Sequence, residues 1–157
     1  MSRSRTWLMK VLEDEDLKLA IARGEYIIHR GRGEGIKPLI DAMDTIGLDN
    51  LKGAILADRI VGLAVSYLAV YAGFSEIHGL IVSRSAINFL ESRGIAIYWM
   101  EAVDAILDRS KSSLCPFEKI ALEVKDPRIF YLLVKNSIMG RSGGKIAAND
   151  LKSSVRF

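Results

Sequence analysis

Two periods of apolar residues follow one another near the start of the chain, and the change of period separates the first elements. Between residues 7 and 12 the apolar side chains fall on one helical stripe, which acidic residues close. From there apolar residues recur at every second position, which predicts a strand over 17–23. A glycine turn and the run YIIHR predict a second strand over 25–30. The pattern thus indicates a helix and then a β-hairpin.

The next stretch predicts a helix, a buried strand and a second helix. Pro38 suits the first turn of a helix, and Gly47 suits its end. The apolar run GAILA, without alternation, is typical of a strand covered on both faces. Asp58 follows that run and is a good N-cap for a helix over about 59–72. That helix is apolar almost all round, so we expect it to be deeply buried.

The remaining elements continue the alternation of strand and helix. EIHGLIV predicts a strand, RSAINFLESRG a helix that Gly94 ends, and IAIYWM a fifth strand. We expect a helix at about 101–109, then helices opened by Pro116 and by Pro127, the last ending near residue 140. Residues 141–157 lack apolar periodicity and are interpreted as a mobile basic tail.

This order of elements predicts the fold class. A hairpin followed by helix–strand units favours parallel neighbours, because crossover helices of this length join parallel strands. We therefore expect a single α/β domain over residues 1–140. Its architecture would be a three-layer α/β/α sandwich, with a five-stranded mixed sheet that an antiparallel hairpin opens.

Charge and composition limit the classes of binding partner that the sequence favours. The formal net charge is +3, and residues 141–157 carry four basic residues against Asp150, also +3, so the body is neutral. That balance does not favour a nucleic-acid surface. One cysteine excludes an intrachain disulfide. The longest apolar stretch, 60–74, is shorter than the roughly 20 residues of a membrane span, and no signal peptide is evident. We expect a cytoplasmic protein without a membrane partner.

Four stretches carry a resemblance to a known family. They are GIKPLIDAM (35–43), AILADRIVGLAV (54–65), IHGLIVSRSAINFLESRGI (77–95) and LCPFEKIALEVKDP (114–127). With the hairpin, residues 12–138 resemble an uncharacterised bacterial and archaeal domain family of cytidine-deaminase-like fold. The resemblance implies that fold and, by analogy, homo-oligomerisation. It implies no activity.

Catalytic deaminases of this fold hold zinc with His or Cys at the starts of two core helices and use a nearby Glu for proton transfer. The junctions that we match to them read LADRIVG and VSRSAI, without His, Cys or Glu. The sequence therefore predicts no zinc-dependent deamination. His29, His78 and Cys115 lack the close spacing of zinc ligands, so neither a metal nor another cofactor is expected.

The predicted junctions also supply candidate ligand-binding residues. Asp58 would lie where open α/β sheets bind small molecules, with Arg59 beside it to neutralise the acid or meet an anion. Ser83, Arg84 and Ser85 begin the next helix and could form an anion site. Capping alone also explains Asp58 and the serines, and solvation alone explains Arg59.

The helix that Pro116 opens supplies candidate catalytic residues. With Cys115 as N-cap, Glu118 occupies the third helical position, a spacing typical of a capping box. A helix N-terminus favours a thiolate, so Cys115 could be reactive, whereas packing alone also explains a single cysteine.

Three functions remain open from the sequence. The first is a small-molecule-binding domain for a nucleotide-like ligand or a small anion. The second is a metal-independent enzyme that uses Cys115 or a carboxylate, Asp58 or Glu118. The third is a structural or regulatory assembly protein with a vestigial pocket.

Overall fold

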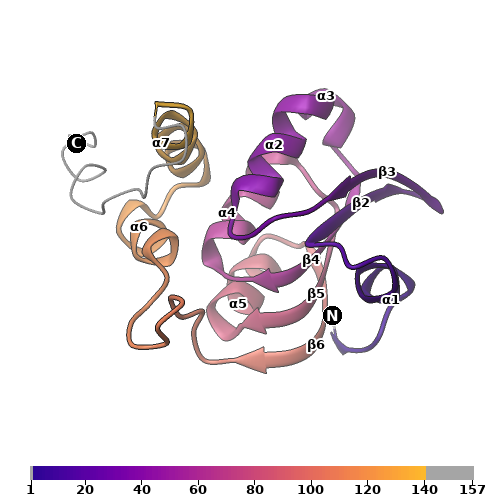
Figure 1. Cartoon of the computed structure of the whole chain (residues 1–157), viewed down its shortest axis with the longest axis horizontal. Helices are drawn as coiled ribbons and strands as arrows, with labels where there is room; N and C mark the ends of the chain where they lie inside the picture. The colour runs from indigo at the N-terminus through magenta and orange to yellow at the C-terminus, as the bar shows by residue number, and fades with distance from the viewer. Residues whose placement is uncertain (1, 141–157) are drawn as a thin grey trace.

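The computed structural model describes residues 2–140. It shows an α/β domain in which one mixed sheet has helices on both faces (Figure 1). The strands are β1 (Ser2–Arg3), β2 (Leu19–Arg23), β3 (Tyr26–Gly31), β4 (Ile55–Val61), β5 (Glu76–Ser83) and β6 (Ala96–Val103). The helices are α1 (Trp7–Asp14), α2 (Lys37–Ile46), α3 (Leu48–Leu51), α4 (Leu63–Ala72), α5 (Arg84–Ser92), α6 (Pro116–Val124) and α7 (Pro127–Gly140).

The strand order is β1-β6-β5-β4-β2-β3. β4, β5 and β6 run parallel, and the hairpin β2–β3 joins antiparallel to β4 through β2. The two-residue strand β1 pairs parallel with β6 and was not expected from the sequence. The mixed sheet of five longer strands and the opening hairpin are confirmed.

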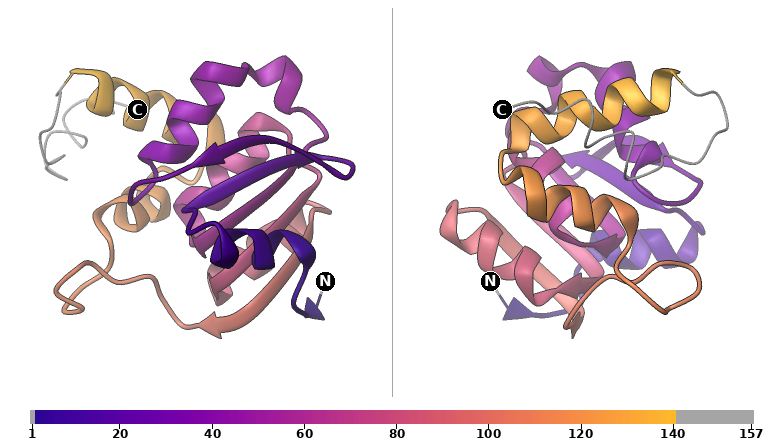
Figure 2. Two further views of the ribbon diagram at one scale, coloured as in Figure 1. Left: turned by 45° about the vertical axis from the view of Figure 1, so that its right-hand side comes forward. Right: turned by 90° about the vertical axis from the view of Figure 1, so that its left-hand side faces the viewer.

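The helices form unequal layers on the two faces of the sheet (Figure 2). α1 covers one face, where a small cluster joins Leu8 and Leu12 to Leu17 and Ala57. α2, α4 and α5 cover the other face, and α6 and α7 pack on the outer side of α4. Because α4 lies between the sheet and two outer helices, nearly all of its side chains are buried, as its apolar sequence predicts.

Two of the predicted boundaries are wrong. β4 continues through Asp58 to Val61, and α4 begins at Leu63 with Gly62 as its N-cap, so Asp58 caps no helix. The helix expected at about 101–109 is absent, because β6 continues to Val103 in parallel register with β5. Sheet pairing there overrides the local helix pattern.

Other boundaries agree with the sequence. Gly47 follows α2, Gly94 lies just beyond α5, and α6 and α7 begin at Pro116 and Pro127. The short helix α3 was not expected. The interpretation of 141–157 as a tail lies outside the described residues. Within residues 2–140, no helix is long and apolar enough to cross a bilayer.

Candidate functional site: a cavity at the carboxyl ends of three parallel strands

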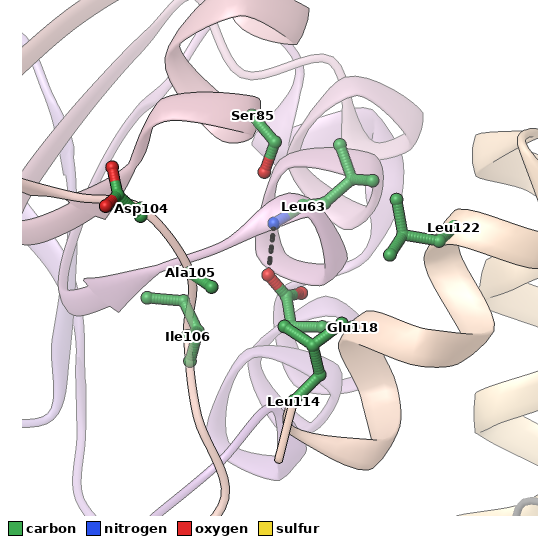
Figure 3. Close-up of a pocket in the computed structure, with 8 residues that line it drawn as sticks. All are labelled: Leu63, Ser85, Asp104, Ala105, Ile106, Leu114, Glu118 and Leu122. Carbon is green, nitrogen blue, oxygen red and sulfur yellow. Dashed lines mark hydrogen bonds between the residues drawn. The ribbon is translucent and has the colours of Figure 1, made fainter. Parts of the chain in front are cut away.

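A cavity lies at the edge of the sheet where the parallel strands β4, β5 and β6 end. It has a volume of about 270 Å³, and we call it the α4–α5 cavity after the two helices that begin there. Leu63, Ser85 and Asp104 come within two residues of the ends of β4, β5 and β6. Its lining residues are Leu63, Ser85, Asp104, Ala105, Ile106, Leu114, Glu118 and Leu122 (Figure 3). Open α/β sheets bind ligands at this edge.

The Glu118 carboxylate is the central polar group of the cavity wall. It reaches from α6 to the start of α4, where its two oxygens accept the backbone N–H groups of Leu63 at 2.8 Å and Ala64 at 2.7 Å. The side chain is buried, with only 6% of the residue exposed. Burial raises the pKa of the Glu118 carboxyl, and the two N–H bonds oppose that rise. Glu118 therefore caps α4 across 55 residues of sequence.

This remote cap replaces a local one. Gly62, the N-cap of α4, has no side chain that could accept the first N–H groups of the helix. A Cβ atom at Gly62 would lie 2.0 Å from Glu118 Oε1, so only glycine leaves room for the carboxylate. The sequence predicted instead that Glu118 completes a capping box with Cys115. Cys115 is the N-cap of α6, but its side chain accepts no capping hydrogen bond.

Ser83 and Ser85 bring hydroxyl groups to the start of α5. Ser83 Oγ accepts the Ala86 N–H at 3.2 Å, so Ser83 is the N-cap, and its hydroxyl is buried. Ser85 lines the cavity, and its Oγ lies 3.1 Å from Ser83 Oγ. Of the two serines, one caps the helix and the other presents a polar group to the cavity.

Arg84 lies outside the cavity wall. Its Nε donates to the Asp104 carboxylate at 3.0 Å, and both side chains are largely exposed. Such an exposed pair contributes little to stability. Asp104, by contrast, lines the cavity. Glu118 and Asp104 are the ionisable side chains of the lining, and both are acidic.

The segment between β6 and α6 forms one side of the cavity, to which it contributes Asp104, Ala105 and Ile106 (Figure 3). Leu107 and Leu114 form an isolated antiparallel bridge, which holds the two ends of the segment together. Between them, Asp108 accepts hydrogen bonds from the serines that follow it, and these bonds lower the pKa of Asp108. An exposed ion pair between Arg109 and Glu34 ties the segment to the loop before α2.

Cys115 lies beside the cavity but is not part of its lining. It is partly buried, and its backbone N–H donates to the Ile106 carbonyl at 3.0 Å. The structure therefore separates the two catalytic candidates, because Glu118 belongs to the lining whereas Cys115 does not.

Asp58 and Arg59 lie away from the cavity and tie three elements together. Asp58 forms an ion pair with Lys18 and accepts the Ile60 N–H at 3.2 Å. Only 1% of Asp58 is exposed, its Oδ2 has no hydrogen-bond partner, and burial raises its pKa against the opposing effect of Lys18. The carboxylate thus lies inside the sheet and not at the strand–helix junction that the sequence indicated.

The Arg59 side chain contacts the C-terminal end of α1. Its Nε donates to the Leu17 carbonyl at 2.5 Å, and its Nη2 donates to the Leu12 carbonyl at 2.8 Å. The guanidinium thereby satisfies carbonyl groups at the end of α1 and in the turn that leads to β2. Asp58 and Arg59 interrupt an apolar run of the sequence because each side chain binds a segment that lies about 40 residues earlier in the chain.

The two histidines lie in different strands, His29 in β3 and His78 in β5. His78 is buried, with Nδ1 2.7 Å from Thr6 Oγ1 and Nε2 3.0 Å from Glu76 Oε2, and burial lowers its pKa. His29 lies in β3, and partial burial lowers its pKa too. Among residues 2–140, no three His, Cys, Asp or Glu side chains group as metal ligands would.

Several groups that form the cavity wall could not be predicted from the sequence. The N–H groups of Leu63 and Ala64 belong to the backbone, and Asp104, Ile106 and Leu122 carry no recognisable motif. The one usable signal is Gly62 directly before an apolar helix, because a helix that starts without a capping side chain needs an acceptor from elsewhere.

Fold and cavity together define a class: an α/β domain with a small, mostly apolar cavity at the carboxyl edge of its parallel strands. Residues 7–138 match the family TM1506, described as a domain of unknown function (DUF1893), so the chain belongs to that family. It is similar to the crystal structure of a DUF1893 family protein (TM1506) from Thermotoga maritima. The TM-score is 0.74 at 26% sequence identity, and the match covers 85% of this chain and 92% of that chain. No curated protein matches the chain.

Proposed function

We propose that the chain is a small-molecule-binding domain of cytidine-deaminase-like fold whose ligand occupies the α4–α5 cavity. The observation that carries the proposal is the buried Glu118 carboxylate in an otherwise largely aliphatic cavity wall. Small-molecule sites combine an apolar lining with a few fixed polar groups in this way. The hairpin followed by alternating helices and strands supports the deaminase-like part of the proposal.

The size of the cavity limits the ligand. The cavity volume of about 270 Å³ leaves room for a compact molecule. A nucleobase or another compact molecule fits this space, whereas a whole nucleotide has more than twice as many heavy atoms. For the nucleotide-like ligands expected from the sequence, we therefore expect the base to be the part that occupies the cavity.

Ser85 and Glu118 are the residues that we expect to contact the ligand. Ser83 positions Ser85 through the contact between their hydroxyl groups, whereas Arg84 forms only an exposed ion pair with Asp104. Asp58 and Arg59 have no place in this proposal, because their contacts lie with α1 and β2.

A thermal-shift screen tests the proposal. Nucleobases, nucleosides, small amines and small organic anions are screened against the wild type, Ala105→Phe and Leu132→Phe. Ala105 lines the cavity, so a phenyl group there fills it, whereas Leu132 lies exposed on α7 and serves as control. We expect a compound that stabilises the wild type and Leu132→Phe but not Ala105→Phe. Equal stabilisation of all three proteins, or none by any compound, contradicts the proposal.

A second candidate function has one observation in its favour. A carboxyl group with a raised pKa beside an apolar cavity is typical of acid–base catalysis, and Glu118 fits that description. A metal-independent enzyme would then use Glu118 for proton transfer. Glu118→Gln would then lose turnover of the screened compound, whereas a binding domain has no turnover to lose.

A further inference from the structure

We infer that the ligand of the α4–α5 cavity is a small cation, a primary amine or an amidine with a short apolar body, held by the Glu118 carboxylate. The inference rests on the proposed function, because it names the ligand class of the same cavity. It follows from the charges of the lining, the free acceptors of the wall and the chemistry of the remaining surface.

The one buried charge of the lining is negative, that of Glu118, because the other acidic side chain, Asp104, is exposed and paired with Arg84. Glu118 and Asp104 are its ionisable side chains, and no Lys, Arg or His belongs to the lining. The Arg84 guanidinium forms an ion pair with Asp104 and is largely exposed. Glu118 is thus a buried carboxylate with backbone dipoles but no cation against it. A buried charge without a counter-charge is costly, and a cationic ligand would supply one.

The Glu118 carboxylate keeps free acceptor sites on the wall. Each Glu118 oxygen takes one backbone N–H and can accept a further donor, since a carboxylate offers about four acceptor sites. The Ser85 hydroxyl can also accept. The donors at the start of α4 are already used by Glu118. An anion could reach them only by displacing a carboxylate that is 6% exposed.

The rest of the lining describes the body of the ligand. Leu63, Ala105, Ile106, Leu114 and Leu122 are aliphatic, so the ligand needs an apolar part beside its charged head. No aromatic residue belongs to the lining, whereas sites for quaternary ammonium ions are aromatic cages. An amine or amidine that donates N–H bonds therefore fits better than a quaternary ammonium ion.

Matched triplets of compounds test the inference. Benzamidine, benzamide and benzoate share one shape but differ in charge, and so do pentylamine, pentanol and pentanoate. Affinities are measured by ligand-observed NMR and thermal shift for the wild type. We expect the cation of each triplet to bind about tenfold more tightly than its neutral analogue, as an added hydrogen bond to a charged group provides.

Three variants assign that preference to the cavity. Glu118→Gln should bind the cation and the neutral analogue about equally. Leu122→Lys puts a like charge on the wall and should weaken the cation about tenfold. Leu132→Lys adds the same charge on α7 outside the lining, so the affinity for the cation should stay unchanged. If Glu118→Gln fails to fold, the comparison of Leu122→Lys with Leu132→Lys still tests the inference.

The other outcomes overturn the inference in distinguishable ways. Equal or tighter binding of the neutral or anionic compounds, still abolished by Ala105→Phe, overturns the cationic ligand and leaves the proposed function standing. Cation binding that Ala105→Phe leaves unchanged overturns both. Absence of binding by every member of both triplets also overturns the inference, while the broader screen decides the proposed function.

Discussion

The Glu118 carboxylate on α6 accepts the backbone N–H of Leu63 at 2.8 Å, so one helix supplies the N-terminal cap of another. Glu118→Ala leaves two buried N–H groups without a partner, and we expect it to lower the free energy of unfolding by about 2–4 kcal/mol. Glu118→Gln keeps one accepting oxygen and should cost about 1 kcal/mol. Urea unfolding measures both values.

Lys119→Ala is the matched control for these variants. It lies next to Glu118 on the exposed side of α6 and makes one long contact, 3.4 Å to Ser113 Oγ. We expect a change within about 0.5 kcal/mol, as for most surface positions. If Glu118→Ala costs no more than Lys119→Ala, the carboxylate does not cap α4.

Gly62 gives a second test of the same contact. In Gly62→Ala the new Cβ meets Glu118 Oε1 at 2.0 Å, although the φ angle of −104° suits any residue. We therefore expect a loss of about 2 kcal/mol in the wild-type background. In the Glu118→Ala background the clash is gone, and the same change should cost about 0.5 kcal/mol or less. Equal costs in both backgrounds would mean that the glycine serves another purpose.

The titration of Glu118 should contribute to the pH dependence of the protein's stability. Because burial raises its pKa above the unfolded value, its favourable contribution is complete below the unfolded pKa and is lost as pH rises through the folded pKa. The stability of the wild type relative to Glu118→Gln should therefore fall between acid and neutral pH. Thermal melts of both proteins across pH 4–8 measure the difference, and a constant difference would contradict the assignment.

His78 should act with the opposite sign. Burial lowers its pKa, so its contribution is complete above the unfolded value and is lost as pH falls through the folded pKa. The contact of Nδ1 with Thr6 Oγ1 holds the start of α1, so this loss should loosen α1. We expect His78→Gln to flatten the fall in melting temperature below pH 6.5. Parallel curves for the variant and the wild type would exclude His78 as its source.

Removing only one partner of the ion pair between Asp58 and Lys18 should lower the stability more than removing both. Lys18→Met leaves a buried carboxylate unpaired, and we expect it to cost about 3 kcal/mol or more at pH 7. Lys18→Met with Asp58→Leu removes both charges and should recover most of that loss. Urea unfolding of the two single variants and the double variant measures the coupling. Additive costs would show that the two charges do not stabilise each other.

Much of the fold could be predicted because local patterns and tertiary packing agree. The alternation in β2 and β3, the glycine after α2 and the prolines that open α6 and α7 all correspond to observed boundaries. Where they disagree, packing wins. Asp58 is a good N-cap by type, yet Lys18, 40 residues away, holds it inside β4.

The candidate site could be predicted in part for the same reason. Ser83 and Ser85 follow from a strand–helix junction that sequence shows directly. Glu118 was found by its spacing from Cys115, but its partners are backbone groups 55 and 54 residues away, which no local pattern contains. Asp104 was assigned to a helix that does not form, so its place at the end of β6 could not be seen.

The assignment of the α4–α5 cavity as the ligand site is tested most directly by the backbone amide chemical shifts of the ¹⁵N-labelled protein. The titrant is the compound that stabilises the wild type most in the thermal-shift screen. We predict the largest changes at Leu63, Ala64 and Ser85, which lie at the starts of α4 and α5 around the cavity. Largest changes around Lys18 and Asp58, or none at the cavity, would contradict the assignment.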